Sequence, residues 1–422
     1  MTHSKYSLIV LLMLALSVRI ALITSSNHSL RSDEIDYQQL AESIREDHSY
    51  STHSGATAYR SPGYPAFISV LMSAVPAISF VLLIQALLET VTCLLLYRIG
   101  SIVANSATGF IAAGIWAFFP SSLLMPGLLL SETLFTTILI GALYTIVTTP
   151  NRTVILGILF GLTILIKPQM VIVTGAYSVW LLCNKEWKKL FVIVSMMCVL
   201  VLPWIVRNIV VMGEPVISTN GGVNFWIGNN LDANGSYKIP KVNPLDSIAK
   251  EVNRNSEGYR EGWKFITTHP LHSAVLAGKK IAYLWSSQHY LLMLSRDGID
   301  PSLSYREHVR TLSLGSIVLM NLPYILLVIY GIAGFFFISM HNTNIRTLLL
   351  VLIFLWMIIH CLYFGSARFN YPLLPILALT ASIGYLHRRD LRLLDNRQRI
   401  LFTLLAGIFL VVLTAELLMT TL

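Results

Sequence analysis

Three carboxylates occupy four consecutive positions near the start of the chain. Asp33, Glu34 and Asp36 follow a first apolar stretch, and Tyr37 comes directly after them. Carboxylates are costly close to hydrocarbon, so this cluster needs either solvent or a chemical task. A carboxylate can act as a general base, and a second carboxylate beside it raises its proton affinity. Acids also stabilise the first turn of a helix, so a purely structural role is equally open.

Four cations lie at the edges of apolar segments farther along the chain: Arg60, Lys167, Arg207 and Arg368. Arginine binds phosphate through paired hydrogen bonds, although a cation at a membrane edge also extends to lipid headgroups. We expect at least one of the four to contact the phosphate of an anionic lipid. Glu132 begins another apolar segment, and a carboxylate in that setting faces a cavity or pairs with a neighbouring helix.

The composition assigns the chain to the polytopic membrane proteins. Its 422 residues are 55% hydrophobic and only 12% charged, whereas about 25% of residues are charged in soluble proteins. The net charge of +9 fits cationic cytoplasmic loops better than nucleic-acid binding. The 4 cysteines lie in apolar runs without metal-type spacing, which argues against a disulfide framework or a zinc site.

Apolar runs predict about eleven transmembrane helices, because each crossing takes about 20 apolar residues. They are expected near residues 7–24, 78–97, 102–119, 128–148, 153–166, 169–184, 189–211, 314–338, 347–363, 371–386 and 400–421. The first run has no clear cleavage site and is predicted to remain as a helix. Lys167-Pro168 separates two short runs, which form either two spans or one re-entrant pair.

Basic residues in the short loops predict a cytoplasmic N-terminus. This orientation places two long polar regions outside, residues 25–65 and 212–312, and both are expected to carry interfacial helices. The cytoplasmic loops are too short for a nucleotide-binding domain, and none carries a glycine-rich phosphate loop. The substrate is therefore expected to be a lipid, a lipid-linked group or an exported molecule.

A run rich in amides follows in the second polar region. It reads Asn220-Gly221-Gly222 and continues to Gly228-Asn229-Asn230, with Trp226 between. Amides and an indole suit the face of a sugar, but Asn-Gly is also a common turn element. By chemistry alone this run leaves both interpretations open.

Taken in order, these segments resemble the polytopic C-type (GT-C) glycosyltransferases, in the family 39-like branch of protein O-mannosyltransferases and lipid A aminoarabinose transferases. The matching segments are Asp33-Glu34 with Tyr37 and Ala41, Tyr59-Arg60-Ser61-Pro62-Gly63-Tyr64-Pro65, Ser131-Glu132-Thr133-Leu134-Phe135, Lys167-Pro168, Pro203-Trp204 with Arg207-Asn208, the Asn220 to Asn230 run, and Arg368 with Tyr371-Pro372. Each motif is short, but together they cover nearly the whole chain in order. Lys167 and Ser61 depart from the pattern, since arginine and proline are common at these positions.

The resemblance implies one all-α GT-C domain over residues 1–422 in a bacterial cytoplasmic (inner) membrane. The donor would be a sugar on polyprenyl phosphate, such as undecaprenyl phosphate, and transfer would invert the anomeric carbon on the periplasmic face. The acceptor would be a glycolipid, O-antigen, lipid A or protein of the cell envelope. No cofactor is implied with certainty; a divalent cation held by Asp33 and Glu34 stays open.

The resemblance also implies roles for individual residues. Asp33 is the expected base, and Glu34 is the neighbouring acid of its motif. Substrate contacts are expected at Tyr37, Arg60, Glu132, Lys167, Arg207, Asn220, Asn229, Arg368 and Tyr371. Asp36 is expected to be a solvated acid in the first turn of its helix.

Two other functions remain open on the sequence. A transporter or flippase of lipid-linked or small solutes would account for the spans and the intramembrane acid, but no inverted repeat is apparent. An O-antigen ligase or polymerase would instead use a lipid-diphosphate donor. Sugar release from a labelled lipid donor separates the first alternative, and comparing monophosphate with diphosphate donors separates the second.

Overall fold

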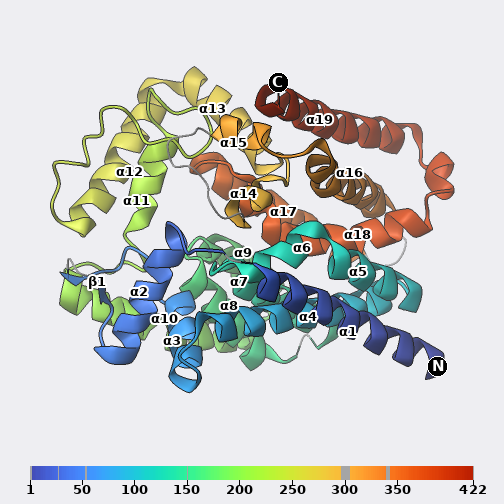
Figure 1. Cartoon of the computed structure of the whole chain (residues 1–422), viewed down its shortest axis with the longest axis horizontal. Helices are drawn as coiled ribbons and strands as arrows, with labels where there is room; N and C mark the ends of the chain where they lie inside the picture. Colours follow the sequence, from blue (N-terminus) through green and yellow to red (C-terminus); the bar gives the residue numbers. More distant parts are fainter. Residues whose placement is uncertain are drawn as a thin grey trace.

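The computed structural model describes residues 2–26, 28–52, 55–149, 151–295, 305–338 and 343–421. These residues form an assembly of helices with one short antiparallel pair of strands, β1 (Ser51–Thr52) and β2 (Gly55–Ala56) (Figure 1). The expected all-α membrane architecture is confirmed, and the chain is a multi-pass membrane protein.

Seven described helices are long and apolar enough to cross a membrane. They are α1 (Thr2–Ser25), α4 (Ile78–Val103), α10 (Trp187–Met212), α16 (Leu314–Phe337), α17 (Thr343–Leu362), α18 (Leu374–Leu386) with its preceding turn η3 (Ala367–Leu373), and α19 (Asn396–Thr421). One further apolar segment is bent by 59° where α5 (Ser106–Phe118) meets α6 (Pro120–Leu124) and η1 (Met125–Gly127), the geometry of a broken span or of a re-entrant loop.

The other three predicted spans also form helices, but shorter ones. They are α7 (Glu132–Thr148), α8 (Thr153–Ile166) and α9 (Met170–Cys183). Lys167 and Pro168 lie in the break between α8 and α9, where the sequence predicts an interruption. Proline lacks the amide hydrogen that a continuing helix needs, so the break exposes polar backbone in an otherwise apolar region.

The two long polar regions lie against each other at one end of the transmembrane helices, and together they are called the roof. The first loop (residues 26–62) carries α2 (Asp33–Glu46), and α3 (Gly63–Ala74) follows it. The cap (residues 213–284) carries α11 (Asn220–Gly228), α12 (Glu251–Thr268) and α13 (Pro270–Leu284), and the chain continues through α14 (Tyr290–Ser295) and α15 (Tyr305–Arg310). Figure 1 shows α2, β1, α11 and α12 at the end opposite the N-terminus.

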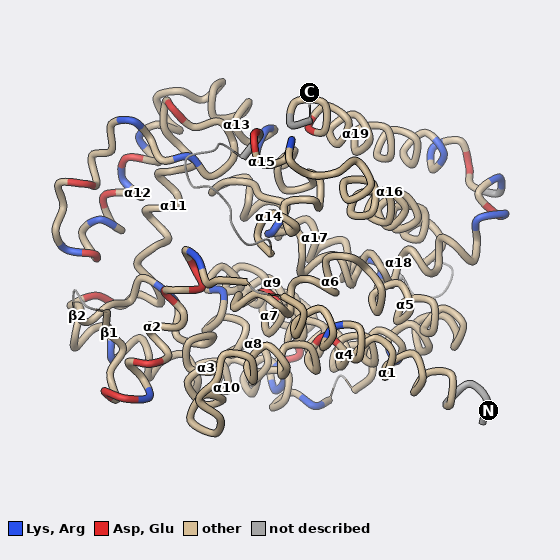
Figure 2. The backbone as a smooth tube through the Cα atoms, in the orientation of Figure 1, with Lys and Arg blue, Asp and Glu red and all other residues tan. Residues whose placement is uncertain are grey.

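Charged residues are concentrated in two parts of the molecule. Lys, Arg, Asp and Glu mark the cap and the segment that joins α18 to α19, which includes η4 (Asp390–Leu393), whereas α16 carries none (Figure 2). A long helix without charged residues, such as α16, is what the interior of a bilayer requires.

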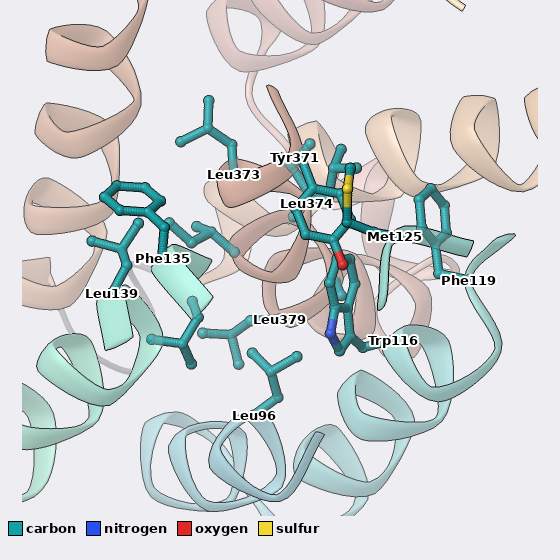
Figure 3. Packing of buried hydrophobic residues seen from close by; sticks show 14 of the residues in the cluster. Leu96, Trp116, Phe119, Met125, Phe135, Leu139, Tyr371, Leu373, Leu374 and Leu379 are labelled. Atoms are coloured by element: carbon teal, nitrogen blue, oxygen red, sulfur yellow. The ribbon is translucent and has the colours of Figure 1, made fainter. Parts of the chain in front are cut away.

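The core surrounds α18. In the apolar stretch formed by η3 and α18, 83% of the residues are buried. In Figure 3, Leu374 and Leu379 lie among side chains of α4, α5 and α7, and Tyr371 lies above Trp116. Both Trp116 and Tyr371 donate to the buried carboxylate of Glu89, at 2.8 and 2.6 Å. These two hydrogen bonds satisfy the buried carboxylate of Glu89 and hold η3 against α4 and α5.

Close packing within the cap depends on glycine. A Cβ atom on Gly258 of α12 would overlap the carbonyl oxygen of Gly222 on α11. The contact brings the amide-rich run against α12, where Asn255 accepts a hydrogen bond from the Gly222 amide at 2.7 Å. An interfacial helix expected in the second polar region is α12, and Phe225 packs on its Tyr259 and Trp263.

Candidate active site

A cavity of about 800 Å³ lies beneath the roof. Its walls come from the first loop, the start of α7, the break between α8 and α9, the cap and the segment that leads into η3. Seven of the predicted site residues line it: Asp33, Tyr37, Arg60, Glu132, Lys167, Asn220 and Arg368. Residues from five parts of the sequence therefore meet in one hollow.

Arg368 is the centre of an ion cluster in this cavity. Its NH1 donates to Asp33 Oδ2 at 2.7 Å, while its Nε and NH2 donate to the two oxygens of Glu132 at 2.8 and 3.2 Å. The paired bonds to Glu132 have the fork geometry that only arginine provides. One guanidinium thus joins the first loop to α7.

Arg60 and Lys167 complete the cluster. Arg60 NH2 donates to Asp33 Oδ1 and to Asp36 Oδ2, both at 2.7 Å, and Lys167 Nζ donates to Glu132 Oε1 at 3.1 Å. Asp36 is therefore ion-paired, and the expectation that it is merely solvated is wrong. Three carboxylates face three cations, so the cluster is electrically balanced.

The backbone before Asp33 is strained. Ser32 has φ 45° and ψ −116°, a conformation that residues other than glycine rarely adopt. Such strain persists only where neighbouring contacts hold it, and it marks sites that need a particular geometry. Here the contacts come from Glu34, which accepts hydrogen bonds from the backbone amides of Arg31 and Leu129 at 3.1 and 2.8 Å.

Glu34 does not line the cavity. It is 4% exposed, and His28 Nε2 lies 2.8 Å from Oε2. Its four polar contacts fasten the start of α2 to the chain before α7, which corresponds to positioning rather than to contact with substrate. Asp33 and Glu34 therefore do not point at a common ion, and the described residues contain no group of three metal-ligating side chains.

Burial raises the pKa of Asp33, but the guanidinium groups of Arg368 and Arg60 outweigh it and hold that pKa well below its usual range. Asp33 is therefore ionised at neutral pH while both arginines remain beside it. A carboxylate in this state is a weak base, since its proton affinity is low. It becomes a better one only where another anion takes its arginine partners.

Three predicted contact residues lie outside the cavity lining. Arg207 donates to the carbonyls of Thr57 and Tyr50, both at 2.8 Å, because its guanidinium stacks on Trp204 and faces the first loop. Asn229 is 2% exposed and bonded to the Leu362 carbonyl and to Lys280. Tyr371 is fully buried against Glu89, so the structure places all three in supporting contacts.

Sequence reasoning missed several lining residues of the cap, of α17 and of the chain that follows it. They include Tyr237, Asn255, Tyr259, His360 and Tyr363. The hydroxyls of Tyr259 and Tyr363 lie 3.0 Å apart, so these two segments meet at the cavity. Their amides and phenols gave no local signal beyond a generic polar loop, because a tertiary contact alone brings them together.

Glu251 is a further residue that the sequence did not single out. Its carboxylate accepts hydrogen bonds from Thr57 Oγ1 at 2.6 Å, from the Ala58 amide at 2.9 Å and from the Thr219 hydroxyl. It thereby joins the first loop to the cap directly before Tyr59-Arg60 and Asn220, which line the cavity.

A family of known sequences matches part of this chain. The family described as dolichyl-phosphate-mannose-protein mannosyltransferase matches residues 60–209, which include Arg60, Glu132 and Lys167. The archaeal oligosaccharyltransferase AglB from Archaeoglobus fulgidus, in complex with an inhibitory peptide and a dolichol-phosphate, superposes over 95% of this chain with a TM-score of 0.51 at 15% identity. The chain has the GT-C glycosyltransferase fold. The fold implied by the resemblance of its motifs is thus confirmed.

Other comparisons have the same character. The apo form of the Archaeoglobus fulgidus enzyme covers 99% of this chain, with a TM-score of 0.51 and 15% identity. This GT-C chain spans about half the length of these archaeal enzymes, 54% and 55%. ArnT from Cupriavidus metallidurans, bound to undecaprenyl phosphate, is similar with a TM-score of 0.44 and 15% identity, over 90% of this chain and 75% of that one. No curated protein sequence matches the chain significantly.

Proposed function

We propose that this GT-C protein is an inverting glycosyltransferase, which moves a sugar from polyprenyl phosphate to an acceptor outside the cytoplasm. The observation that carries the proposal is the cavity, where an ionised carboxylate and three cations face one space. The family match over residues 60–209 and the fold support a lipid-phosphate sugar as donor. In a bacterium the carrier would be undecaprenyl phosphate, and the cavity would face the periplasm.

Asp33 is the proposed base. It takes the proton from the acceptor hydroxyl or amine as that group attacks the anomeric carbon. The bond from the anomeric carbon to the phosphate oxygen breaks, and the polyprenyl phosphate leaves with the electron pair. Arg368 and Lys167 stabilise the charge that develops on this leaving group.

The balanced cluster suggests how the donor prepares the base. A phosphate that enters the cluster adds negative charge and competes with a carboxylate for the arginines. Asp33 is the carboxylate that yields, because its side chain is 24% exposed, whereas Glu132 is 1% exposed and holds Arg368 through paired bonds. Losing its arginine partners raises the proton affinity of Asp33 at the step that needs a base.

The first prediction concerns the donor. Purified full-length protein should release labelled sugar from undecaprenyl-phosphate hexose or aminoarabinose, and at least about tenfold more slowly from the corresponding diphosphates, since one phosphate matches the three cations. Chromatography of the released sugar measures both rates. Movement of the intact donor across a membrane is measured separately, in vesicles loaded with the donor.

Two results would contradict the proposal. Movement of intact donor across the vesicle membrane without sugar release would indicate a transporter. Release from the diphosphate donor alone would indicate a ligase or polymerase of lipid-diphosphate glycans.

A second prediction follows from the position of Arg207. Arg207→Gln removes two hydrogen bonds to first-loop carbonyls, so we expect the protein to lose about 1–3 kcal/mol of stability. Its affinity for undecaprenyl phosphate should change less than in Lys167→Gln, because Lys167 lines the cavity and Arg207 does not. Thermal unfolding and lipid titration of the two variants measure these effects. An equal loss of lipid affinity in both variants would place Arg207 at the phosphate.

A further inference from the structure

A second, smaller pocket adjoins the main cavity. Its volume is about 170 Å³, and its lining is Tyr59, Thr219, Val223, Asn243, Leu245, Asp246, Glu251 and Arg254. Tyr59 also lines the main cavity, and Thr219 directly precedes Asn220, which does so too. Tyr59 is therefore part of the lining of both the small pocket and the main cavity.

The polar groups of this pocket divide into two sets. Glu251 is saturated by Thr57, Ala58 and Thr219, and it serves as a fixed floor. Asn243 is likewise used: its oxygen accepts from Trp226 Nε1 at 3.1 Å, and its Nδ2 donates to Asp246 Oδ1 at 2.7 Å. This second bond orients the Asp246 carboxylate, whose other oxygen accepts no hydrogen bond from the part of the chain that the structure describes.

The remaining groups are available to a ligand. Among the described residues, neither the Arg254 guanidinium nor the Tyr59 hydroxyl makes a hydrogen bond. Arg254 and Asp246 are exposed, so the pocket opens to water. The main cavity, in contrast, is bordered by Ile172 of α9, whose exposed apolar side chain suits a lipid.

We infer that the small pocket binds one sugar unit of the acceptor, while the acceptor hydroxyl reaches past Tyr59 into the main cavity; this rests on the proposed function. One water needs roughly 10–15 Å³, so the pocket has room for about a dozen heavy atoms, the size of a hexose. Only Val223 and Leu245 are apolar in its lining. A cation, a carboxylate oxygen and a phenol around one small space favour a polyhydroxylated ligand over an apolar side chain.

The pocket lies close to the proposed base. The Arg60 guanidinium lies 5.2 Å from the centre of the Tyr59 ring, and the same group donates to Asp33 at 2.7 Å. The Tyr59 ring and the Arg60 guanidinium therefore connect a sugar in the pocket to Asp33. This places the acceptor on the watery side of the site and the lipid donor on the apolar side.

The test uses full-length protein in detergent and an equimolar mixture of methyl glycosides of glucose, galactose and mannose. Saturation-transfer NMR should detect binding to the unaltered protein. Asp246→Asn and Arg254→Gln should each weaken it about tenfold, since each removes a charged hydrogen-bonding group. Arg260→Gln is the matched control, because Arg260 is an exposed arginine of α12 that does not line the pocket.

Sugar release from the lipid-phosphate donor is measured in the same variants. At low acceptor concentration it should fall about tenfold in Asp246→Asn and Arg254→Gln, in step with their weaker glycoside binding, and should stay within about twofold of the unaltered rate in Arg260→Gln. Glycoside binding that is equal in all variants would overturn the inference, as would displacement by a serine-containing tripeptide, which would indicate a protein acceptor. Failure of the unaltered protein to release any sugar would instead count against the proposed function.

Discussion

Asp33→Asn should lower sugar transfer by about a thousandfold, because general-base catalysis contributes about 10²–10⁴ to a rate. The amide keeps the shape of the side chain but cannot accept the proton of the acceptor. It also releases Arg60 and Arg368 from their ion pairs with Asp33. Affinity for undecaprenyl phosphate should therefore stay the same or increase while turnover falls. Single-turnover transfer and lipid titration measure these two effects separately.

Asp36→Asn is the matched control for this prediction. Asp36 lies on the same helix and shares Arg60 with Asp33, but its side chain is 43% exposed, is not paired with Arg368 and does not itself line the cavity. Its loss should change transfer by at most about threefold, as expected for an exposed ion pair. Transfer by Asp33→Asn within tenfold of the unaltered protein would remove Asp33 from the role of base.

The sequence predicted much of this site because its charged residues are costly in an apolar chain. Asp33, Glu132 and Arg368 were recognisable since each interrupts or borders an apolar run, and such residues need a cavity or a partner. The length of the apolar runs placed the helices. Lys167-Pro168 interrupted one such run, and the structure has a break between α8 and α9 there. The ion pairs of Arg368 were beyond sequence reasoning, because its partners Asp33 and Glu132 lie 335 and 236 residues away along the chain.

The predicted contact residues that lie outside the cavity lining have a common physical feature. Arg207, Asn229 and Tyr371 have the residue types of ligand contacts, but in the fold they satisfy buried backbone carbonyls and the carboxylate of Glu89. A buried polar group is expensive without a partner, so supporting contacts recruit the same chemistry as a binding site. Glu34 shows this most clearly: it neighbours Asp33 in sequence, yet its carboxylate anchors the strained turn that aims Asp33.

Arg368→Gln should have the largest effect on folding. Glu132 would keep only Lys167, and Asp33 only Arg60, so a charge that is 1% exposed would lose its strongest partner. Removing one member of a buried ion pair costs about 3–5 kcal/mol. The midpoint of thermal unfolding in detergent, followed by tryptophan fluorescence, should fall accordingly. Arg260→Gln breaks an exposed pair on α12 and should cost less than about 1 kcal/mol.

The double variant Glu132→Gln with Arg368→Gln separates folding from function. It removes a negative and a positive charge together, so part of the lost stability should return: Asp33 keeps Arg60, and the charge left without its partner is that of Lys167, whose side chain is 12% exposed against 1% for Glu132. Sugar transfer should remain at least about a hundredfold below the unaltered rate, since the leaving phosphate still lacks the Arg368 guanidinium. Recovery of transfer together with stability would show that Arg368 only holds the fold. Loss of stability in the double variant equal to that of Arg368→Gln would show that Glu132 is not the charge that Arg368 neutralises.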